Sequence, residues 1–448
     1  MYLAGKKISI VGGGLVGSLL SLYLTKQGAK VSVFDKREDL RLDQNLAGRS
    51  INLALSNRGM QALDKVGILE DIMLISMPMC KRIMHAVDGQ LTEQPYGKEG
   101  QAIYSVSRHT LNAKLIDLAE DHSVNFSFQT QCLGADIHET KLKLSNQSSL
   151  QFDFIFGADG AGSSIRKAIS KSFPDIKIVE ELIDYGYKEL TIPANNDGSH
   201  KLAKDALHIW PRKSYMVIAL PNLDGTFTCT LFSPMKGKSS FESLVNSADI
   251  DNFFTDNFFD LKQLIPDLPV QYFNNPLGSL GFVSSTSWKV KNTFLIGDAC
   301  HAPIPFYGQG MNAGFEDCFL LNNHIIEEGG LDAESIDYFL NNRIIDTMAM
   351  QELSRINFIE MRDKTATNQF LLQKKIEAWF SEKNPDIWIP LYSMVTFSHM
   401  PYSQALSLGH KQDLIMKKVM AKNNLNRFFS IRELEEKKIE TQIKDLIN

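Results

Sequence analysis

The sequence predicts an α/β fold in which an antiparallel β-sheet domain is inserted into a nucleotide-binding domain and a helical region follows. Three observations favour it. The first 35 residues have the pattern of one strand–helix–strand unit with parallel strands. Short strands with alternating or aromatic-rich patterns dominate between about 175 and 290. Helical patterns dominate after about residue 315 of the 448-residue chain, which is long enough for two or three domains.

The N-terminal unit begins with a predicted strand at 7–11, which is short, apolar and rich in β-branched residues. A glycine turn and an apolar helix follow, and the helix ends near Gly28. A second strand at 30–35 completes the unit. Residues 8–25 carry no charge, but three consecutive glycines interrupt this run. We therefore expect neither a membrane span nor a signal peptide here.

The glycine turn has the spacing Gly12-x-Gly14-x-x-Gly17 between a strand and a helix, which is typical of dinucleotide sites. The first glycine permits the tight turn, the second lets the backbone approach a pyrophosphate, and the third lets helix and strand pack closely. The helix start offers free N–H groups and a partial positive charge to phosphates. Asp35 ends the second strand, where a carboxylate can accept hydrogen bonds from ribose hydroxyls and repels a 2′-phosphate. The sequence therefore favours FAD or NAD over NADP at this site.

The domain boundaries follow from changes in the strand and helix patterns. Alternating strands occur between 206 and 232, with a hairpin turn at 221–225. The strand at 293–298 is again of the buried, parallel type, and helices are expected near 50–72 and 107–122. We assign 1–75, 100–175 and 288–330 to a Rossmann-like FAD-binding domain, 76–99 and 176–287 to a β-rich substrate domain, and 331–448 to a helical C-terminal region.

Composition excludes several classes of protein. The chain has 47 basic and 52 acidic residues, net −5, which argues against a nucleic-acid partner. Five cysteines without a C-x-x-C pair predict free thiols in a reducing compartment. The charged pattern of 430–441 predicts an amphipathic helix rather than an anchor. We therefore expect a cytoplasmic protein without a membrane segment or metal site, either a monomer or a homodimer.

Two further segments carry glycines and aspartates in distinctive positions. One, 156–166, contains Asp159; the other, 296–314, contains Asp298 and the glycines Gly308 and Gly310. Both resemble motifs of the single-component flavoprotein aromatic hydroxylases, typified by p-hydroxybenzoate hydroxylase. The resemblance implies bound FAD, with Asp298 at its ribityl chain and the glycine turn and helix start beside the isoalloxazine, where fixed dipoles stabilise reduced flavin. It also associates Asp159 with both FAD and NAD(P)H, whereas Asp298 alone would equally fit a helix cap.

The run 48–59, Gly-Arg-Ser-Ile-Asn-Leu-Ala-Leu-Ser-Asn-Arg-Gly, narrows the resemblance. Taken locally, it predicts a loop leading to a helix capped by Ser56. It also resembles a motif of the kynurenine 3-monooxygenases, whose eukaryotic members carry a hydrophobic C-terminal membrane segment that this sequence lacks. The similarity continues to about residue 400 through the segments 103–112, 185–190, 208–212, 308–317, 358–362 and 391–397.

The resemblance implies a pocket for the amino-acid head of kynurenine. Arg82 and, 14 residues later, Tyr96 would hold the carboxylate together with Tyr392. An arginine fork suits a carboxylate because it binds bidentately. Taken singly, Arg82 could be a strand-surface charge and Tyr96 a turn aromatic; only the combination favours a site.

The resemblance also places residues near the amine and the ring of kynurenine. Asn357 and Glu360 share one helix face, three residues apart, near the amine. Phe306 packs on the ring close to the flavin. Read alone, these residues would fit an exposed helix face and a core aromatic. His301 is interpreted as structural, because this chemistry needs no histidine.

The implied activity is hydroxylation of L-kynurenine to 3-hydroxykynurenine with NADPH and O2, through a flavin C4a-hydroperoxide, without a certain catalytic side chain. Alternatives are another flavoprotein hydroxylase or epoxidase acting on a different aromatic compound, a flavin reductase of isoprenoid chains, and a non-catalytic flavin-binding sensor. The halogenase motif W-x-W-x-I-P is absent. The expected cofactor-binding residues are Gly12, Gly14, Gly17, Asp35, Arg37, Arg108, Asp159, Asp298, Gly308, Gly310, Met311 and Asn312.

Overall fold

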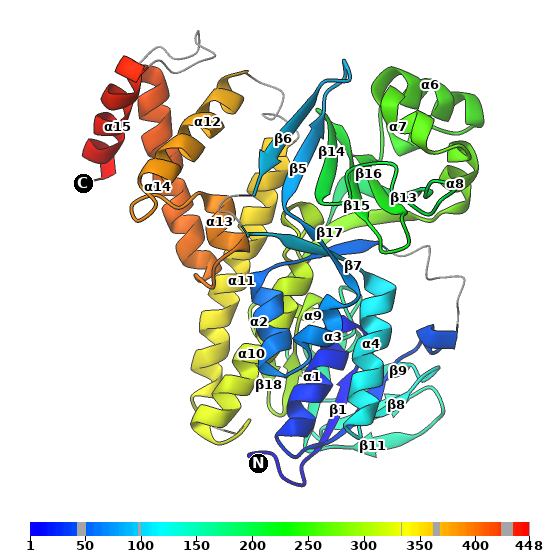
Figure 1. Cartoon of the computed structure of the whole chain (residues 1–448). Helices are drawn as coiled ribbons and strands as arrows, with labels where there is room; N and C mark the ends of the chain where they lie inside the picture. Colours follow the sequence, from blue (N-terminus) through cyan, green and yellow to red (C-terminus); the bar gives the residue numbers. More distant parts are fainter. Residues whose placement is uncertain (43–50, 97–99, 333, 362–367, 423–432, 448) are drawn as a thin grey trace.

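The computed structural model describes residues 1–42, 51–96, 100–332, 334–361, 368–422 and 433–447 (Figure 1). The first residues of the run 48–59, up to Ser50, lie outside the described part, as do Arg362 of the segment 358–362 and residues 430–432 of the predicted amphipathic helix. The α/β class, the inserted antiparallel sheet and the helical C-terminal region are all confirmed. Among the described helices, none combines the length and the apolar character needed to cross a membrane.

A six-stranded sheet forms the centre of the nucleotide-binding part, in the order β18-β19-β12-β1-β2-β8. β1 (Lys7–Val11) lies between β2 (Lys30–Phe34) and β12 (Phe154–Gly157) and runs parallel to both. β19 (Thr293–Leu295) continues the parallel sheet beside β12. The predicted parallel strand–helix–strand unit is thus confirmed, and the later strand near 293 joins the same sheet.

Helix α1 (Leu15–Lys26) packs against α4 (Arg108–Asp121) and α10 (Gly310–Glu328). The contact with α10 is close, because a Cβ atom on Gly314 would lie 2.6 Å from Cγ2 of Val16. The starts of α1 and α10 therefore lie near each other, although about 300 residues separate them in the sequence.

The inserted domain is built on a seven-stranded sheet, in the order β17-β13-β16-β15-β14-β5-β6. All its pairs are antiparallel except β14 with β5. The predicted turn at 221–225 joins β15 to β16. Three helices between 247 and 274, which the sequence did not predict, add to this domain (Figure 1). The strands are β5 (Lys81–His85), β6 (Leu91–Pro95), β13 (Ile178–Ile192), β14 (Ala206–Arg212), β15 (Tyr215–Pro221), β16 (Phe227–Pro234) and β17 (Leu277–Ser285).

A small three-stranded sheet lies between the two domains, with β7 (Ile103–Ser107) paired to β3 (Asn52–Leu55) and β4 (Ser76–Met79). The helix predicted near 50–72 is therefore wrong for 52–55, because pairing with β7 extends this stretch. Helix α2 begins only at Asn57, after Ser56, whose side chain makes no capping hydrogen bond. The predicted helix near 107–122 is confirmed as α4.

The C-terminal region consists of helices, of which α11 and α14 pack against each other. In Figure 1 these helices lie along one side of both preceding domains. The helices are α11 (Ile336–Ile359), α12 (Asn368–Lys383), α13 (Leu391–Thr396), α14 (Tyr402–Lys422) and α15 (Glu433–Ile447).

The remaining elements include the edge strands β8 and β18 and the three helices of the inserted domain. They are η1 (Leu40–Leu42), α2 (Asn57–Lys65), α3 (Leu69–Met73), β8 (Asn125–Ser127), β9 (Cys132–Asp136), β10 (Lys141–Leu144), β11 (Ser149–Gln151), α5 (Ser164–Ser172), η3 (Phe241–Ser243), α6 (Ser247–Asn257), α7 (Phe259–Leu264), α8 (Leu268–Asn274), β18 (Lys289–Val290), α9 (Asp298–His301) and η4 (Pro305–Tyr307).

Two buried histidines join neighbouring strands of the seven-stranded sheet. His208 donates from Nε2 to the carbonyl of Ala203 at 2.9 Å, so its Nδ1 accepts from Nε2 of His85, also at 2.9 Å. His85 in turn contacts Asp260 at 2.9 Å and stacks on Trp210, with ring centroids 4.0 Å apart. Burial lowers the pKa of His208 to about 4.

This depressed pKa predicts a loss of stability in acid. The unfolded chain takes up a proton on His208 near pH 6.5, whereas the folded chain does so only near pH 4. The neutral His208 therefore contributes its full share to the free energy of unfolding above pH 6.5. This contribution falls, by about 3 kcal/mol in total, as the pH drops towards 4. The free energy of unfolding of His208→Asn should lack this component. Parallel pH profiles for the wild type and the variant would contradict the prediction.

Candidate active site

The glycine turn after β1 has a backbone that only glycine fits. Gly12 has φ 105°, and a Cβ atom there would lie 2.4 Å from the carbonyl oxygen of Ala158. A Cβ on Gly17 would lie 1.9 Å from the carbonyl oxygen of Gly12. No side chain caps α1, and its first turn holds no acidic residue, so no side chain of the helix itself occupies its first N–H groups. This geometry fits a pyrophosphate.

Asp35 lies directly after β2 and is 5% exposed. Its Oδ2 accepts a hydrogen bond from the Gly13 amide at 2.8 Å, and its carboxylate pairs with Arg37 at 2.7 Å. Burial alone would raise the pKa of Asp35, but the hydrogen bonds from Arg37 and Gly13 hold it below its ordinary value. The carboxylate is thus ionised, and it fixes the glycine turn. The guanidinium of Arg37 also lies beside the turn, with NH2 4.0 Å from a Cβ built on Gly14.

A second glycine turn precedes α10. Gly308 has φ 68°, and α10 starts at Gly310 without a side-chain cap or an early acidic residue. Asp298 is exposed, and its Oδ1 lies 4.0 Å from a Cβ built on Gly310. Met311 is partly exposed beside it. An exposed carboxylate and an uncapped helix start thus meet at one place, which fits a ribityl chain and the anionic edge of a flavin.

Two further expected cofactor residues, Asn312 and Asp159, have partners within the protein. Buried Asn312 donates to the carbonyls of Ala54 and Gly308, both at 2.9 Å, and so fastens the second glycine turn. Asp159 accepts hydrogen bonds from Ser163, the N-cap residue of α5, and from Ser164. Arg108 is exposed at the start of α4. The side chains of Asn312 and Asp159 therefore stabilise the turns on which they lie.

Glu189, which the sequence analysis did not select, is electrostatically coupled to Arg108. Burial raises the pKa of Glu189 to about 7, and the positive charge of Arg108 counteracts this rise. Because β13 carries Glu189 and α4 begins with Arg108, this interaction links the two domains.

Arg82, on β5, is surrounded by tyrosine rings. Its guanidinium carbon lies 4.0 Å from the ring centroid of Tyr392 and 5.0 Å from that of Tyr96. Tyr392 stacks between Tyr96 and Tyr307, with centroids at 5.7 and 5.9 Å. We call Tyr96, Tyr307 and Tyr392 the tyrosine cage. The structure thus brings the three predicted residues together and adds Tyr307, which sequence reasoning missed although it follows Phe306 directly.

Two polar groups at the tyrosine cage, the Tyr96 hydroxyl and the Arg82 guanidinium, have no anionic partner among the described residues. Tyr96 is 4% exposed, and its hydroxyl is buried without a hydrogen-bond partner among the described residues. Within the same residues, no carboxylate forms an ion pair with Arg82, and the groups that act most strongly on its charge are the neighbouring tyrosines. Burial would lower the pKa of Arg82, but Tyr392, Tyr96 and Tyr307 hold it above its ordinary value. A cation and a hydroxyl donor are therefore both available to a bound anion.

The second half of the predicted pocket lies where α11 meets η4. Nδ2 of Asn357 donates to the carbonyl of Phe306 at 2.6 Å. The Phe306 ring contacts Phe232 and Phe358, with centroids at 4.9 and 4.5 Å. Glu360, at the end of α11, contributes to raising the pKa of Tyr307, after burial and Tyr392. A shallow, mostly apolar pocket adjoins this turn, lined by Tyr185, Lys213, Ser214, Tyr215, Met216, Phe232, Phe306, Phe358 and Met361.

Known protein sequences are similar to this one over most of its length. Residues 6–223 and 277–334 match a family model described as an FAD binding domain. A kynurenine 3-monooxygenase of Flavobacterium johnsoniae is 48% identical over 442 residues, which cover 97% of this chain and 98% of the relative. The chain belongs to the kynurenine 3-monooxygenase family. A kynurenine 3-monooxygenase of Dictyostelium discoideum is 39% identical over 440 residues, covering 94% and 95% of the two chains.

Members of the kynurenine 3-monooxygenase family are FAD-dependent monooxygenases, so this chain is a flavoprotein enzyme. Two solved structures share its fold. A 2-methyl-3-hydroxypyridine-5-carboxylic acid oxygenase aligns with a TM-score of 0.65 at 20% identity, over 82% of this chain and 95% of its own. PqsL of Pseudomonas aeruginosa, in complex with 2-aminobenzoylacetate, aligns with a TM-score of 0.64 at 15% identity, over 80% and 97%. At such identities they support the fold alone.

His301 has a structural environment in this kynurenine 3-monooxygenase family member. It is buried, and its Nε2 contacts Oδ2 of Asp317 at 2.5 Å. Its ring stacks on Trp288, with centroids 4.9 Å apart. These contacts agree with the structural role expected from the sequence.

Proposed function

We propose that this enzyme hydroxylates L-kynurenine to 3-hydroxykynurenine, with bound FAD, NADPH as the reductant and O2 as the oxidant. One observation carries the choice of substrate: Arg82 and the orphaned Tyr96 hydroxyl are held in the tyrosine cage without an anionic partner among the described residues. Kynurenine has a carboxylate for this cation and an aromatic ring for the apolar turn beside it.

In this proposal Arg82 binds the substrate carboxylate, and the hydroxyls of Tyr96 and Tyr392 donate hydrogen bonds to it. The carboxylate of Glu360 and the amide of Asn357 lie towards the substrate ammonium. Because Asn357 also holds the carbonyl of Phe306, the same residue sets the position of the ring that packs on the substrate. The substrate is thereby fixed at both ends, which is what a positioned aromatic hydroxylation needs.

FAD, when bound, supplies the redox chemistry, which transfers electrons from NADPH to oxygen. The two glycine turns, at 12–17 and 308–310, would hold its pyrophosphate and the edge of its ring system, and Asp35 and Asp298 would bind its hydroxyl groups. Arg37, Arg108, Asp159 and Met311 are proposed as further contacts. Aromatic and apolar side chains around Phe306 exclude water from the reacting ring.

The cellular setting is part of the same proposal. All five cysteines are free in the structure, and four of them are buried. Free thiols are common in reducing compartments, which supports a cytoplasmic location. We propose that the enzyme acts as a monomer or a homodimer.

The function can be tested by product analysis. Purified yellow protein should oxidise NADPH slowly alone and at least about tenfold faster with L-kynurenine, since binding energy from the amino-acid head supports the reaction. Mass spectrometry should identify 3-hydroxykynurenine. The matched control is 2-aminoacetophenone, which keeps the ring and ketone but lacks the amino-acid head. It should increase the rate of NADPH oxidation only slightly. Equal stimulation by both compounds, or a product other than 3-hydroxykynurenine, would overturn the proposed substrate.

A further inference from the structure

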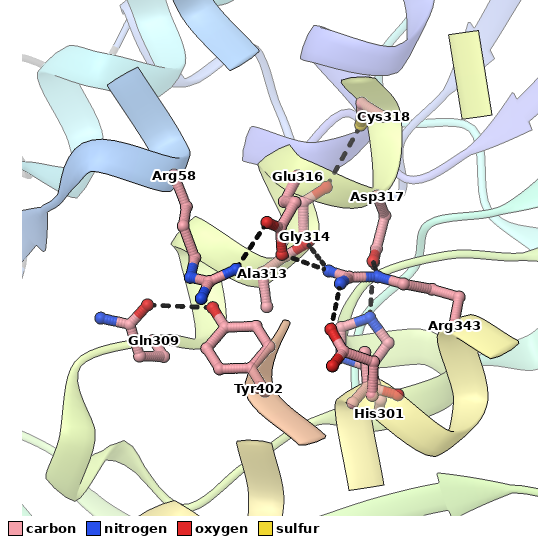
Figure 2. A network of polar contacts seen from close by, with 12 residues as sticks. Arg58, His301, Gln309, Ala313, Gly314, Glu316, Asp317, Cys318, Arg343 and Tyr402 are labelled. Atoms are coloured by element: carbon pink, nitrogen blue, oxygen red, sulfur yellow. Dashed lines mark hydrogen bonds and ion pairs between the residues drawn. The ribbon is translucent and has the colours of Figure 1, made fainter. Parts of the chain in front are cut away.

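Arg58, at the start of α2, is a buried cation with no role in the cofactor and substrate contacts described above. It is 1% exposed, and its guanidinium lies 4.0 Å from the ring centroid of Tyr402. Its NH1 donates to Glu316 at 2.7 Å, its Nε to the carbonyl of Val395 at 3.1 Å, and its NH2 to the carbonyl of Met400. Figure 2 shows Arg58 pointing between Glu316 and Tyr402.

These partners belong to the two parts of the site. Val395 lies on α13, three residues after Tyr392 of the tyrosine cage. Glu316 lies on α10, one turn after Asn312 and the second glycine turn. The Tyr402 hydroxyl also donates to Oε1 of Gln309, the residue before α10, at 3.0 Å (Figure 2). One guanidinium therefore contacts the element that carries a substrate tyrosine and the helix that begins at the proposed flavin edge.

The residues around Arg58 hold the same helix start. The Ser56 amide donates to Oδ1 of Asn312 at 2.9 Å, and Nδ2 of Asn312 donates to the Ala54 carbonyl at 2.9 Å. A Cβ atom on Gly59 would lie 2.5 Å from that Oδ1. The stretch 54–59 thus fits against the α10 start on one side and reaches α13 through Arg58 on the other.

Glu316 does not depend on Arg58 alone for its charge balance. Its other oxygen pairs with Arg343 at 2.9 Å, and Arg343 also pairs with Asp317 and Asp346. For holding these partners, the positive charge of Arg58 is therefore less important than the fixed directions of its three donor groups. A lysine there could still pair with Glu316, but its single ammonium does not reproduce three donors in fixed directions.

We propose that Arg58 is a positioning residue that keeps Tyr392 and the tyrosine cage in register with the flavin turn at 308–310. The expected effect on kynurenine binding rests on the proposed function. The contacts of Arg58 that join α2 to α10 and α13 are present whatever the substrate is.

The test compares Arg58→Lys with Lys188→Met. Lys188 is a matched control, because it is a buried cation held by two carbonyls, of Tyr272 and Asn275, beside a tyrosine ring, and it lies on β13 outside the site. Arg58→Lys should retain FAD and raise the dissociation constant for kynurenine about tenfold. It should also form more hydrogen peroxide per NADPH oxidised, because a displaced Tyr392 changes both the binding and the orientation of the substrate. Lys188→Met should lower the melting temperature without these changes.

Hydrogen exchange supplies a readout that is independent of the substrate. In Arg58→Lys the amides of 391–397 should exchange faster than in the wild type, and in Lys188→Met they should not. Unchanged exchange at 391–397, or unchanged kynurenine affinity in a variant whose wild type binds kynurenine, would overturn the positioning role. If the wild type neither binds nor hydroxylates kynurenine, the proposed function fails. Hydrogen exchange at 391–397 then still decides whether Arg58 holds α13.

Discussion

Arg82→Met should weaken the binding of L-kynurenine at least about 30-fold, equivalent to about 2 kcal/mol, because a partly buried carboxylate loses its charged partner. Methionine keeps the apolar stem against the rings of Tyr96 and Tyr392, so the tyrosine cage should stay folded. Equilibrium titration of the purified variant measures the effect.

Arg82→Lys provides the control for charge alone. A lysine restores a cation but not the bidentate fork, so its affinity should lie between those of the wild type and Arg82→Met. FAD content should be unchanged in both variants, because Arg82 lies on β5 and not in either glycine turn. Wild-type kynurenine affinity in Arg82→Met would remove this residue from the site.

Gly12→Ala should abolish FAD binding. A methyl group at this position would lie 2.4 Å from the carbonyl oxygen of Ala158 and 2.8 Å from Cα of Asp159, both of which are backbone atoms. The positive φ of 105° adds strain of about 1 kcal/mol or more, and the turn that presents the α1 amides would have to move. The purified variant should be colourless, with a lower melting temperature.

Gly89→Ala is the matched control for this substitution. Gly89 lies in the exposed turn between β5 and β6 with φ 83°, and a Cβ atom there meets nothing within 4 Å. This variant should keep its yellow colour and lose only the stability that the positive φ costs, about 1 kcal/mol. A stable, yellow Gly12→Ala protein would show that the first glycine turn does not approach a cofactor.

Local patterns were enough to predict the nucleotide-binding half of the fold. A strand, a glycine turn and a helix are contiguous in the sequence, so the role of Gly12 and the place of Asp35 after β2 follow from short-range spacing. The helix predicted near 50–72 failed at 52–55, because pairing with β7, about 50 residues away, extends this stretch. Local propensity cannot register such a partner.

In the candidate site, too, some residues could be predicted from the sequence and others could not. The resemblance to a family selected Arg82, Tyr96 and Tyr392, and the structure brings them within contact distance. Tyr307 and Arg58 were not selected, because their importance comes from partners more than 80 residues away in the sequence, such as Tyr392 and Val395. Their roles depend on packing between the nucleotide-binding domain and the C-terminal helices, which spacing along the chain does not show.

The central claim is that the cation in the tyrosine cage binds the carboxylate of an amino acid beside the flavin. Kynuramine, which is kynurenine without its carboxylate, tests it most directly when both compounds are titrated into wild-type and Arg82→Met protein and the visible flavin band is followed. The wild type should bind kynurenine much more tightly than kynuramine, and Arg82→Met should bind the two alike. A preference for kynurenine that survives in Arg82→Met would contradict the claim.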